Sequence, residues 1–490
     1  MAQFALALLL LGLFSNGVLS VNDRLREVFN WRQVDFVFPD QQTRQQAINN
    51  REFIQANNMP LGLEVWRNRL FITVPRWKAG VASTLNYINL DSSNRNRSPP
   101  LIPYPSYEMN RLPTRYERPV DHIINTFRLS VDKCDRLWAI DMGASNGTIV
   151  GEPQLFIFDL NRDRTVRQFT ISSRLRRTDG STWFPGLIVD SEPGECDRSF
   201  AYLPDIGWGM VVYSFQSNEA WRIEHNYFYF DPLSTVFNMG GVRVEWTDGV
   251  FGLGLSERHS DGYRTLYFQA LASTRIFSVN TRLLQANVSM TSEIFDQYVH
   301  HGHRPAGMQA ASMSMDEVSG AIFFALINQD AIGCWNPRRF QRHSIGNSAI
   351  VAQDRTTLFF PADLKVDLQS NFWVLSDRMP VFRFQVNRFD VNDVNYRVFT
   401  APVSELIRGT VCESNGGFNG NFNNINGNAG SVNFNDNINF NSQNENFNNN
   451  DNINFNNGLG INPSRPPRPS TPNFNRGENA NGWSTPNRNK

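Results

Sequence analysis

The sequence predicts an all-β protein, a six-bladed β-propeller with a disordered Asn-rich C-terminal tail. Three observations support this fold. A short apolar strand with a large aromatic side chain at its centre recurs six times. Each of these anchor strands follows an apolar strand that ends near an acidic or small polar turn, and a third strand comes next. The anchor residues are Phe71, Trp138, Phe200, Tyr267, Phe323 and Trp373.

The pattern is clearest in the second repeat, over VDKCDRLWAIDMG at 131–143. One strand ends at Val131, a polar turn follows, and the anchor strand continues to Asp141 with alternating apolar positions. The strands expected before the six anchors lie at 60–65, 127–132, 185–190, 250–256, 309–315 and 362–367. The third strands are clearest at 84–90, 154–160, 209–215 and 275–280.

A propeller must join its last blade to its first. The alternating segment at 34–39 is one candidate for the closing strand, and 396–402 is the competing one. Long connections are expected at 91–120, 173–185 and 286–306. Long loops on a rigid scaffold often carry binding sites.

Both ends of the chain differ in composition from its centre. Residues 1–20 contain an apolar run followed by small residues, which predicts a secretory signal peptide and a secreted, extracellular protein without a membrane anchor. The propeller is expected over 21–412. Residues 413–490 are dominated by Asn, with interspersed Phe, Ile, Gly and Pro. That composition cannot bury enough apolar surface to fold alone, so a disordered tail is expected.

Four cysteines in a secreted chain indicate disulfides. Cys134 and Cys196 each precede an anchor residue at the same spacing, so a bridge between adjacent blades is favoured, which leaves Cys334 for Cys412. The sequence alone still allows three connectivities. Three Asn-x-Ser/Thr motifs predict glycosylation, with the second and third preferred over the first because a proline follows the first. They begin at Asn96, Asn146 and Asn287.

Charge and motifs exclude several classes of function. The 46 basic and 46 acidic residues balance, so the chain lacks the basic surface of a nucleic-acid binder. It contains no HExxH or Gly-rich phosphate motif. His300, His301 and His303 cluster without a matching ligand spacing, which favours a solvated loop over a metal site. No metal and no cofactor are expected.

A ligand site is predicted where the anchor strands end, because these ends share one face of a propeller with the starts of the channel strands. Converging carboxylates and amides there suit a cationic or polyhydroxylated small ligand. The alternative is that these polar groups cap strands and bond to loop backbone. The candidate ligand-binding residues are Arg76, Asp141, Asp205, Gln269, Asn328 and Asp377.

Several long motifs carry a family resemblance. RLFITVPRWKAGVASTLNYINL, CDRLWAIDMG, LFFPADLKVD and NFWVLSDRMPVF resemble the yellow/major royal jelly protein family of insects, and its yellow branch most closely, over about residues 28–412. The resemblance implies a secreted six-bladed propeller. It also implies a role in cuticle pigmentation or hardening through the catecholamine-to-melanin pathway. Yellow itself carries additional cysteines around the second repeat, so fewer bridges are expected here.

The resemblance leaves the activity open, because the family has no catalytic motif to carry over. One hypothesis is an enzyme acting on dopa- or dopamine-derived intermediates, as in dopachrome conversion. The other is a non-catalytic structural or amine-binding protein of cuticle, eggshell or secretion. Its expected partners are a small aromatic amine or catechol and matrix components. A metal-dependent lactonase is disfavoured because Glu64 is expected inside or late in its strand rather than at the channel mouth.

Overall fold

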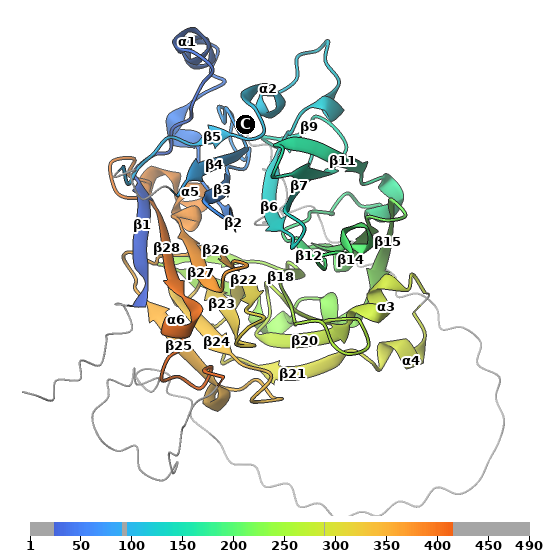
Figure 1. The fold of residues 1–490 in the computed structure, drawn as a ribbon. Helices are drawn as coiled ribbons and strands as arrows, with labels where there is room; N and C mark the ends of the chain where they lie inside the picture. The colour runs from blue at the N-terminus through green and yellow to red at the C-terminus, as the bar shows by residue number, and fades with distance from the viewer. Residues whose placement is uncertain (1–23, 91–95, 289, 415–490) are drawn as a thin grey trace, which may run out of the picture. The chain divides into compact units, whose positions relative to one another are not determined.

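The computed structural model describes residues 24–90, 96–288 and 290–414, and all of them belong to one compact unit. Within these residues six four-stranded antiparallel sheets form a ring around a central channel, which confirms the six-bladed propeller (Figure 1). The predicted signal peptide and nearly all of the predicted tail lie outside the described residues. The predicted boundary at residue 412 therefore stays a prediction.

Every blade places its innermost strand at the channel and its anchor residue on the second strand, as expected. The innermost strands are β2 (Gly62–Trp66), β6 (Thr126–Val131), β12 (Ile188–Asp190), β18 (Val250–Leu255), β22 (Ala310–Met315) and β26 (Pro361–Val366). The second strands are β3 (Arg69–Thr73), β7 (Arg136–Asp141), β13 (Phe200–Asp205), β19 (Thr265–Ala270), β23 (Ile322–Leu326) and β27 (Asn371–Ser376).

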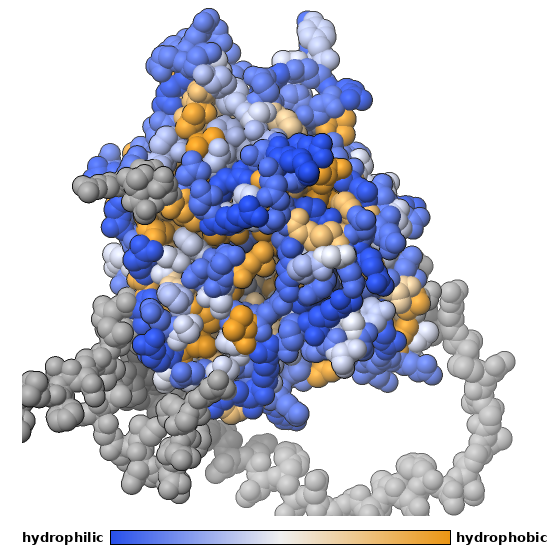
Figure 2. Space-filling view, in the orientation of Figure 1, coloured by the Kyte–Doolittle hydropathy of each residue, from blue (hydrophilic) through white to orange (hydrophobic). Residues whose placement is uncertain are grey.

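The third strand of each blade is still largely buried, and the outermost strand is the more exposed one. The third strands are β4 (Leu85–Asn89), β10 (Gln154–Asp159), β14 (Gly209–Ser214), β20 (Arg275–Asn280), β24 (Ala331–Trp335) and β28 (Tyr396–Pro402). The outermost strands are β5 (Ile102–Pro103), β11 (Arg164–Thr170), β15 (Glu219–Glu224), β21 (Val299–His303), β25 (Ser348–Gln353) and β1 (Arg26–Trp31). Figure 2 shows a largely hydrophilic surface in which hydrophobic residues form small separate patches.

The connections add short elements. Two small hairpins consist of β8 (Ala144–Ser145) with β9 (Thr148–Ile149) and β16 (Val236–Met239) with β17 (Val242–Glu245). The helices are α1 (Gln41–Asn49), α2 (Tyr107–Asn110), α3 (Thr281–Gln285), α4 (Ser292–Phe295), α5 (Met379–Phe384) and α6 (Val403–Leu406). No helix in the described part of the chain is long and apolar enough to cross a membrane.

Two of the tryptophan anchors are held by the same hydrogen bond. The Trp138 indole donates to the carboxylate of Asp132 at 2.8 Å, and the Trp373 indole donates to that of Asp367 at 2.9 Å. Each aspartate lies six residues before its tryptophan, where the innermost strand turns into the anchor strand. The same carboxylates also accept backbone N–H groups of the turn, so one side chain fixes both the turn and the buried indole.

The closing strand differs from both candidates. β1 pairs with β28 in the sheet that also holds β27 and β26, so the N-terminal segment completes the last blade. The competing candidate 396–402 is β28 itself, the partner of the closing strand. Segment 34–39 contributes only an isolated bridge between Phe36 and Leu101. Its alternation has another cause, because Phe36 is buried and packs edge-on against Phe53, with ring centroids 5.8 Å apart.

The histidine cluster also differs from the expected loop, because His300, His301 and His303 lie on β21, the outermost strand of the fourth blade. Outermost strands are largely exposed, so their polar sequence hides the alternation on which a strand prediction depends. The His301 ring bonds to the Ser278 hydroxyl at 2.8 Å. Among the residues that the structure describes, no group of three or more potential ligands is placed to hold a metal ion.

Both favoured disulfides are present and are confirmed. Cys134 is bonded to Cys196 and Cys334 to Cys412, with Cα–Cα distances of 5.9 and 6.2 Å. All four cysteines lie in the described residues, so none is free. The first bridge links turns of neighbouring blades, and the second ties β24 to the segment after the last blade. Such cross-links typically stabilise a fold by about 2–4 kcal/mol.

The predicted glycosylation sites lie on the surface. Asn146 is exposed at the turn between β8 and β9, Asn287 is exposed after α3, and Asn96 is exposed at the edge of a connection. Exposure is compatible with modification, and glycosylation itself stays a prediction.

Candidate functional site

The innermost strands of all six blades line a cavity of about 130 Å³ in the central channel. Three consecutive blades contribute a mainly apolar wall and the other three contribute charged side chains. The apolar residues are Leu187, Val189, Phe251, Leu253, Leu255, Met313 and Met315. On the innermost strands the charged residues are Glu64, Arg128, Asp363 and Lys365. The turns that follow these strands add the charged lining residues Asp132, Lys133, Arg264, Glu317 and Asp367. The cavity therefore presents one surface suited to a flat apolar ring and another suited to polar or ionic groups.

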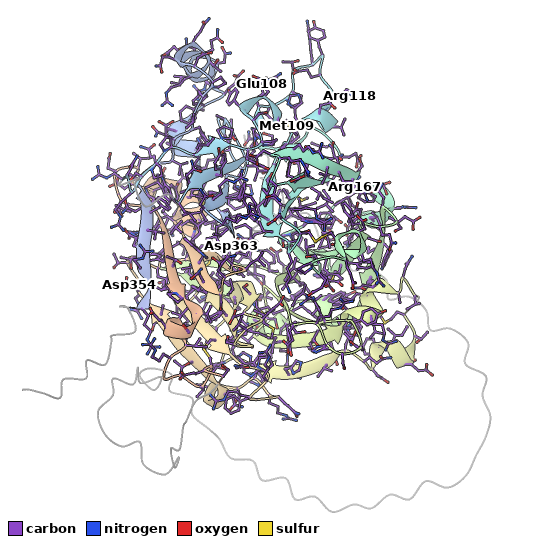
Figure 3. All side chains as sticks on the ribbon, viewed as in Figure 1. Glu108, Met109, Arg118, Arg167, Asp354 and Asp363 are labelled. Atoms are coloured by element: carbon purple, nitrogen blue, oxygen red, sulfur yellow. A yellow bond between two sulfur atoms is a disulfide. The ribbon has the colours of Figure 1, made fainter. Side chains whose placement is uncertain are left out.

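Asp363 and Arg128 form the fixed centre of the charged wall. Their side chains are almost fully buried and form an ion pair at 3.3 Å. Figure 3 shows Asp363 near the centre of the ring. Its carboxylate also accepts the Ser312 hydroxyl at 2.8 Å and the Leu63 backbone N–H at 3.0 Å.

The Arg128 guanidinium is equally well satisfied. It donates to the carbonyl oxygens of Leu61 and Ala362, both at 2.7 Å. Its contacts and those of Asp363 join four blades across the channel. Buried charges are tolerated when they are paired and hydrogen-bonded in this way. We therefore assign this pair to the framework of the channel.

Glu64 is the titratable group of the cavity that changes charge near neutral pH. Its carboxyl oxygens accept the backbone N–H groups of Val65 at 3.0 Å and Val131 at 3.2 Å. Burial raises the pKa of Glu64 to about 7, opposed by the positive charge of Lys365. The Lys365 ammonium donates to the Leu129 carbonyl at 3.0 Å. A cavity carboxyl with such a pKa is typical of groups that exchange protons or bind cations reversibly.

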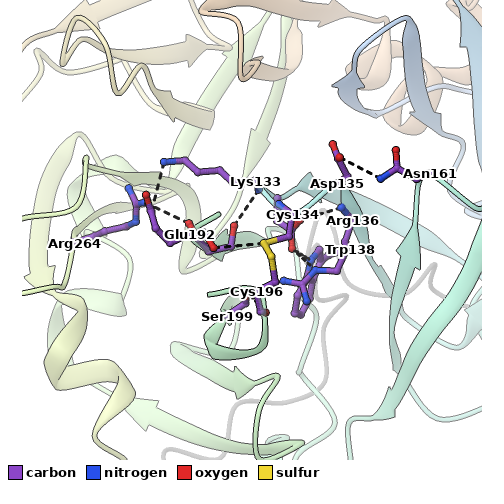
Figure 4. Close-up of a disulfide and its surroundings, with 12 residues drawn as sticks. Lys133, Cys134, Asp135, Arg136, Trp138, Asn161, Glu192, Cys196, Ser199 and Arg264 are labelled. Atoms are coloured by element: carbon purple, nitrogen blue, oxygen red, sulfur yellow. Dashed lines mark hydrogen bonds and ion pairs between the residues drawn. A yellow bond between two sulfur atoms is a disulfide. The ribbon is translucent and has the colours of Figure 1, made fainter. Parts of the chain in front are cut away.

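One mouth of the channel carries an ionic network that we call the mouth cluster, namely Lys133, Asp190, Glu192, Arg264 and Glu317. Arg264 has a side chain only 2% exposed and pairs with Asp190 at 2.9 Å, with Glu317 at 3.1 Å and with Glu192. Lys133 pairs with Glu317 at 2.7 Å. Figure 4 shows Lys133, Glu192 and Arg264 beside the Cys134–Cys196 disulfide. The cluster thus connects turns from four blades.

The six residues predicted as ligand-binding lie at or just after the ends of the anchor strands, on the face of the ring opposite the mouth cluster, and none of them lines the cavity. The three aspartates of this predicted set share one local motif. Each carboxylate accepts the backbone N–H two residues later, at 3.0 Å for Asp141, 3.0 Å for Asp205 and 2.8 Å for Asp377. Asp141 also accepts the N–H groups of Ile124 and Asn125. These bonds are the ones expected of strand caps.

The other predicted residues are also bonded within the protein. Arg76 is buried and donates to carbonyl oxygens of the surrounding loops, including that of Val81 at 3.1 Å. Asn328 donates to the Gln309 side chain at 2.8 Å, and Gln269 donates to the Ala310 carbonyl at 3.2 Å. No hydrogen bond or ion pair joins any two of the six, although Arg76 and Asp141 interact electrostatically. A ligand-binding role for this set stays a prediction.

Two of these six residues keep an acceptor atom free. Among the described residues, the Oδ2 atom of Asp377 and the Oε1 atom of Gln269 are buried and have no hydrogen-bond partner. Burial raises the pKa of Asp377 well above its ordinary value, and the Met379 N–H and the positive charge of Arg128 oppose this effect.

The charged residues of the cavity were not predicted as a site. Glu64, Arg128 and Lys365 lie inside the apolar segments PLGLEV, FRLSVD and ADLKVD, which were interpreted only as strands. A signal for them does exist in the sequence. A charged side chain inside an otherwise apolar innermost strand must face the channel, because the other face of that strand packs between blades.

Comparison with known proteins agrees with this architecture. The family model described as major royal jelly protein matches residues 124–412. Protein yellow of Drosophila subobscura is 38% identical over 416 residues, which cover 84% of this chain and 71% of that protein. Protein yellow of Drosophila melanogaster is 39% identical over 400 residues, which cover 80% of this chain and 71% of that protein. The chain belongs to the yellow/major royal jelly protein family.

Proposed function

We propose that this protein acts outside the cell in insect pigmentation, and that its central channel binds or converts a catecholamine-derived small molecule. Family membership supports the pigmentation role, and the signal-peptide composition together with two disulfides supports secretion. The observation that carries the ligand class is the two-sided lining of the channel cavity.

A catecholamine has a flat apolar ring and a polar or cationic end, which correspond to the two walls. The ring packs against side chains such as Phe251, Leu253 and Met313, and the ammonium group pairs with the ionised carboxylate of Glu64. Because the pKa of Glu64 is about 7, the carboxylate is available from neutral pH upward. Binding of an amine should weaken below that pH.

If the protein converts its ligand, the carboxyl of Glu64 is the group that transfers the proton. Tautomerisation of a dopachrome-like substrate moves a proton between carbon and oxygen, and a group with a pKa near 7 can accept and donate that proton efficiently. A protein that binds such a molecule without turning it over would instead act as a non-catalytic carrier or structural protein. Turnover distinguishes the two hypotheses.

The test is titration calorimetry with dopamine on wild type and on Glu64→Gln, with the exposed Glu219→Gln as matched control. Loss of a buried carboxylate that pairs with a ligand cation should weaken binding by about 2–5 kcal/mol, and the control should bind like wild type. Decay of dopachrome absorbance, against heat-denatured protein, measures conversion. Unchanged binding by Glu64→Gln but weak binding by Asp141→Asn, Asp205→Asn or Asp377→Asn would move the site to the predicted face. No binding to wild type would overturn the ligand proposal.

A further inference from the structure

The basic residues of this chain are almost all arginine. Of its 46 basic residues only Lys78, Lys133, Lys365 and Lys490 are lysines, which leaves 42 arginines. Lysine is ordinarily among the commonest residues of globular proteins. Both residues supply positive charge and surface solubility, so the bias must concern a property in which they differ.

None of the three lysines in the described part of the chain is fully exposed. Lys133 and Lys365 line the cavity. Lys78 follows β3 beside the aromatic core, with its ammonium nitrogen 3.6 Å from the centroid of the Phe382 ring. All four cysteines form disulfides. The outer surface that the structure describes therefore displays guanidinium groups but neither a fully exposed lysine amine nor a thiol.

Amines and thiols differ from guanidinium groups chiefly as nucleophiles. A guanidinium stays protonated at any physiological pH, whereas the neutral amine of lysine attacks electrophilic carbons. The oxidised form of a catechol is an o-quinone, an electrophile that adds amines and thiols. We propose that this protein is built to work among o-quinones, and that Lys78 is the position at which it captures one covalently. The proposal rests on the proposed function, since it requires a catechol-derived ligand.

The surroundings of Lys78 distinguish it from the two cavity lysines. Lys133 forms an ion pair with Glu317 at 2.7 Å, and Lys365 lies next to the carboxyl of Glu64. Lys78 is half-buried, and neither an ion pair nor a hydrogen bond connects it to any described residue. Its charged neighbour is Arg383, whose guanidinium lies 5.1 Å from the centroid of the Trp77 ring.

The Phe382 ring face favours the ammonium form of Lys78, whereas its burial and the positive charge of Arg383 favour the neutral amine. Burial and the positive charge of Arg383 lower the pKa of Lys78 to about 8. At pH 7 such a lysine contains roughly two orders of magnitude more neutral amine than an ordinary lysine. Lys78 can therefore react at a pH at which most lysines are protonated.

The reaction is a conjugate addition. The Lys78 nitrogen attacks a ring carbon of the quinone and forms a C–N bond, while the electron pair moves to the quinone oxygens. The proton lost from nitrogen and the proton lost from the attacked carbon end on the two oxygens. The product is an aminocatechol attached to the protein, so the step needs no further oxidant or reductant.

The experiment treats the full-length protein at pH 7 with an o-quinone freshly prepared from methylcatechol and maps the adducts by mass spectrometry. We expect Lys78 to be modified at least tenfold faster than Lys133 and Lys365. Lys78→Arg should remove this adduct, whereas Lys133→Arg should leave it unchanged. The rate at Lys78 should rise with pH to a midpoint near 8. In Arg383→Met the midpoint should move upward, which a purely structural role of Arg383 would not produce.

Equal modification of all lysines, or no adduct at Lys78, would overturn the proposal. Circular dichroism confirms that each variant is folded before it is compared. The calorimetric titration with dopamine keeps the two proposals separate. An adduct at Lys78 without dopamine binding would refute the channel site and leave quinone capture standing, and the reverse result would refute quinone capture alone.

Discussion

The ends of the anchor strands and the interior of the channel use carboxylates in different ways. Where the anchor strands end, Asp141 and Asp205 are buried and accept several hydrogen bonds, mostly from backbone N–H groups. Inside the channel, Glu64 lines the cavity and accepts only two. The carboxylates at the strand ends therefore maintain the structure, whereas Glu64 has fewer partners within the protein.

The difference shows that the role of a carboxylate in this propeller depends on its hydrogen-bond partners and not on whether it lies at a strand end. Backbone donors use up the lone pairs of a capping aspartate, so little capacity is left for a ligand. In the channel, Asp363 is satisfied in the same way by Arg128, Ser312 and Leu63, whereas Glu64 has fewer donors around it. Stability measurements on variants of the two classes of carboxylate test this difference.

The largest effect is expected for Asp141→Ala. This substitution leaves the buried N–H groups of Ile124, Asn125 and Gly143 without their acceptor. Each unsatisfied buried group costs about 1–3 kcal/mol, so a loss of about 3–5 kcal/mol in the free energy of unfolding is expected after partial relaxation. Urea unfolding measures it, with exposed Glu219→Ala as the control. A loss below about 1 kcal/mol would contradict a capping role.

The next effect concerns the pH dependence that Glu64 creates. Its pKa is raised from 4.5 in the unfolded chain to about 7 in the fold. Between these values the folded protein binds the extra proton, so the free energy of unfolding falls as pH rises from about 4.5 to 7. The total fall is about 3 kcal/mol. In Glu64→Gln this contribution should disappear, as urea unfolding across that pH range would show.

Asp248 provides a matched comparison, because burial alone raises its pKa to about 7 and it does not line the cavity. Asp248→Asn should likewise remove a fall in the free energy of unfolding as the pH rises toward 7. Dopamine should then distinguish the two positions, because a bound cation favours ionised Glu64 and should restore stability near neutral pH only when Glu64 is present. An identical response in both variants would argue against a ligand at Glu64.

The smallest effect is expected at the mouth cluster. Arg264→Met leaves Asp190, Glu192 and Glu317 with less compensation, and the burial of Arg264 makes its pairs stronger than surface pairs. Because its partners are partly exposed, we expect a loss of about 2 kcal/mol rather than the value for a fully buried pair. The exposed pair of Arg338 and Glu257 is the control, and Arg338→Met should cost less than about 1 kcal/mol. Equal losses would show that burial adds nothing at this mouth.

The six-fold repeat could be predicted from the sequence alone. Trp138 and Trp373 recur with an aspartate six residues before them, and such local patterns follow from the alternation of strands and the chemistry of tight turns. The disulfide pairing followed for the same reason, since Cys134 and Cys196 occupy equivalent places in neighbouring repeats. Family membership rested on long motifs that are equally local.

The positions of the closing strand and of the charged side chains depend on the tertiary structure. The closing strand at Arg26–Trp31 pairs with residues more than three hundred positions away, and no local pattern distinguishes it from the segment that follows. Arg128 and Asp363 meet across the channel for the same reason. Whether a polar group caps a strand or faces a cavity depends on donors supplied by other blades, because hydrogen bonds and burial are properties of the assembled ring.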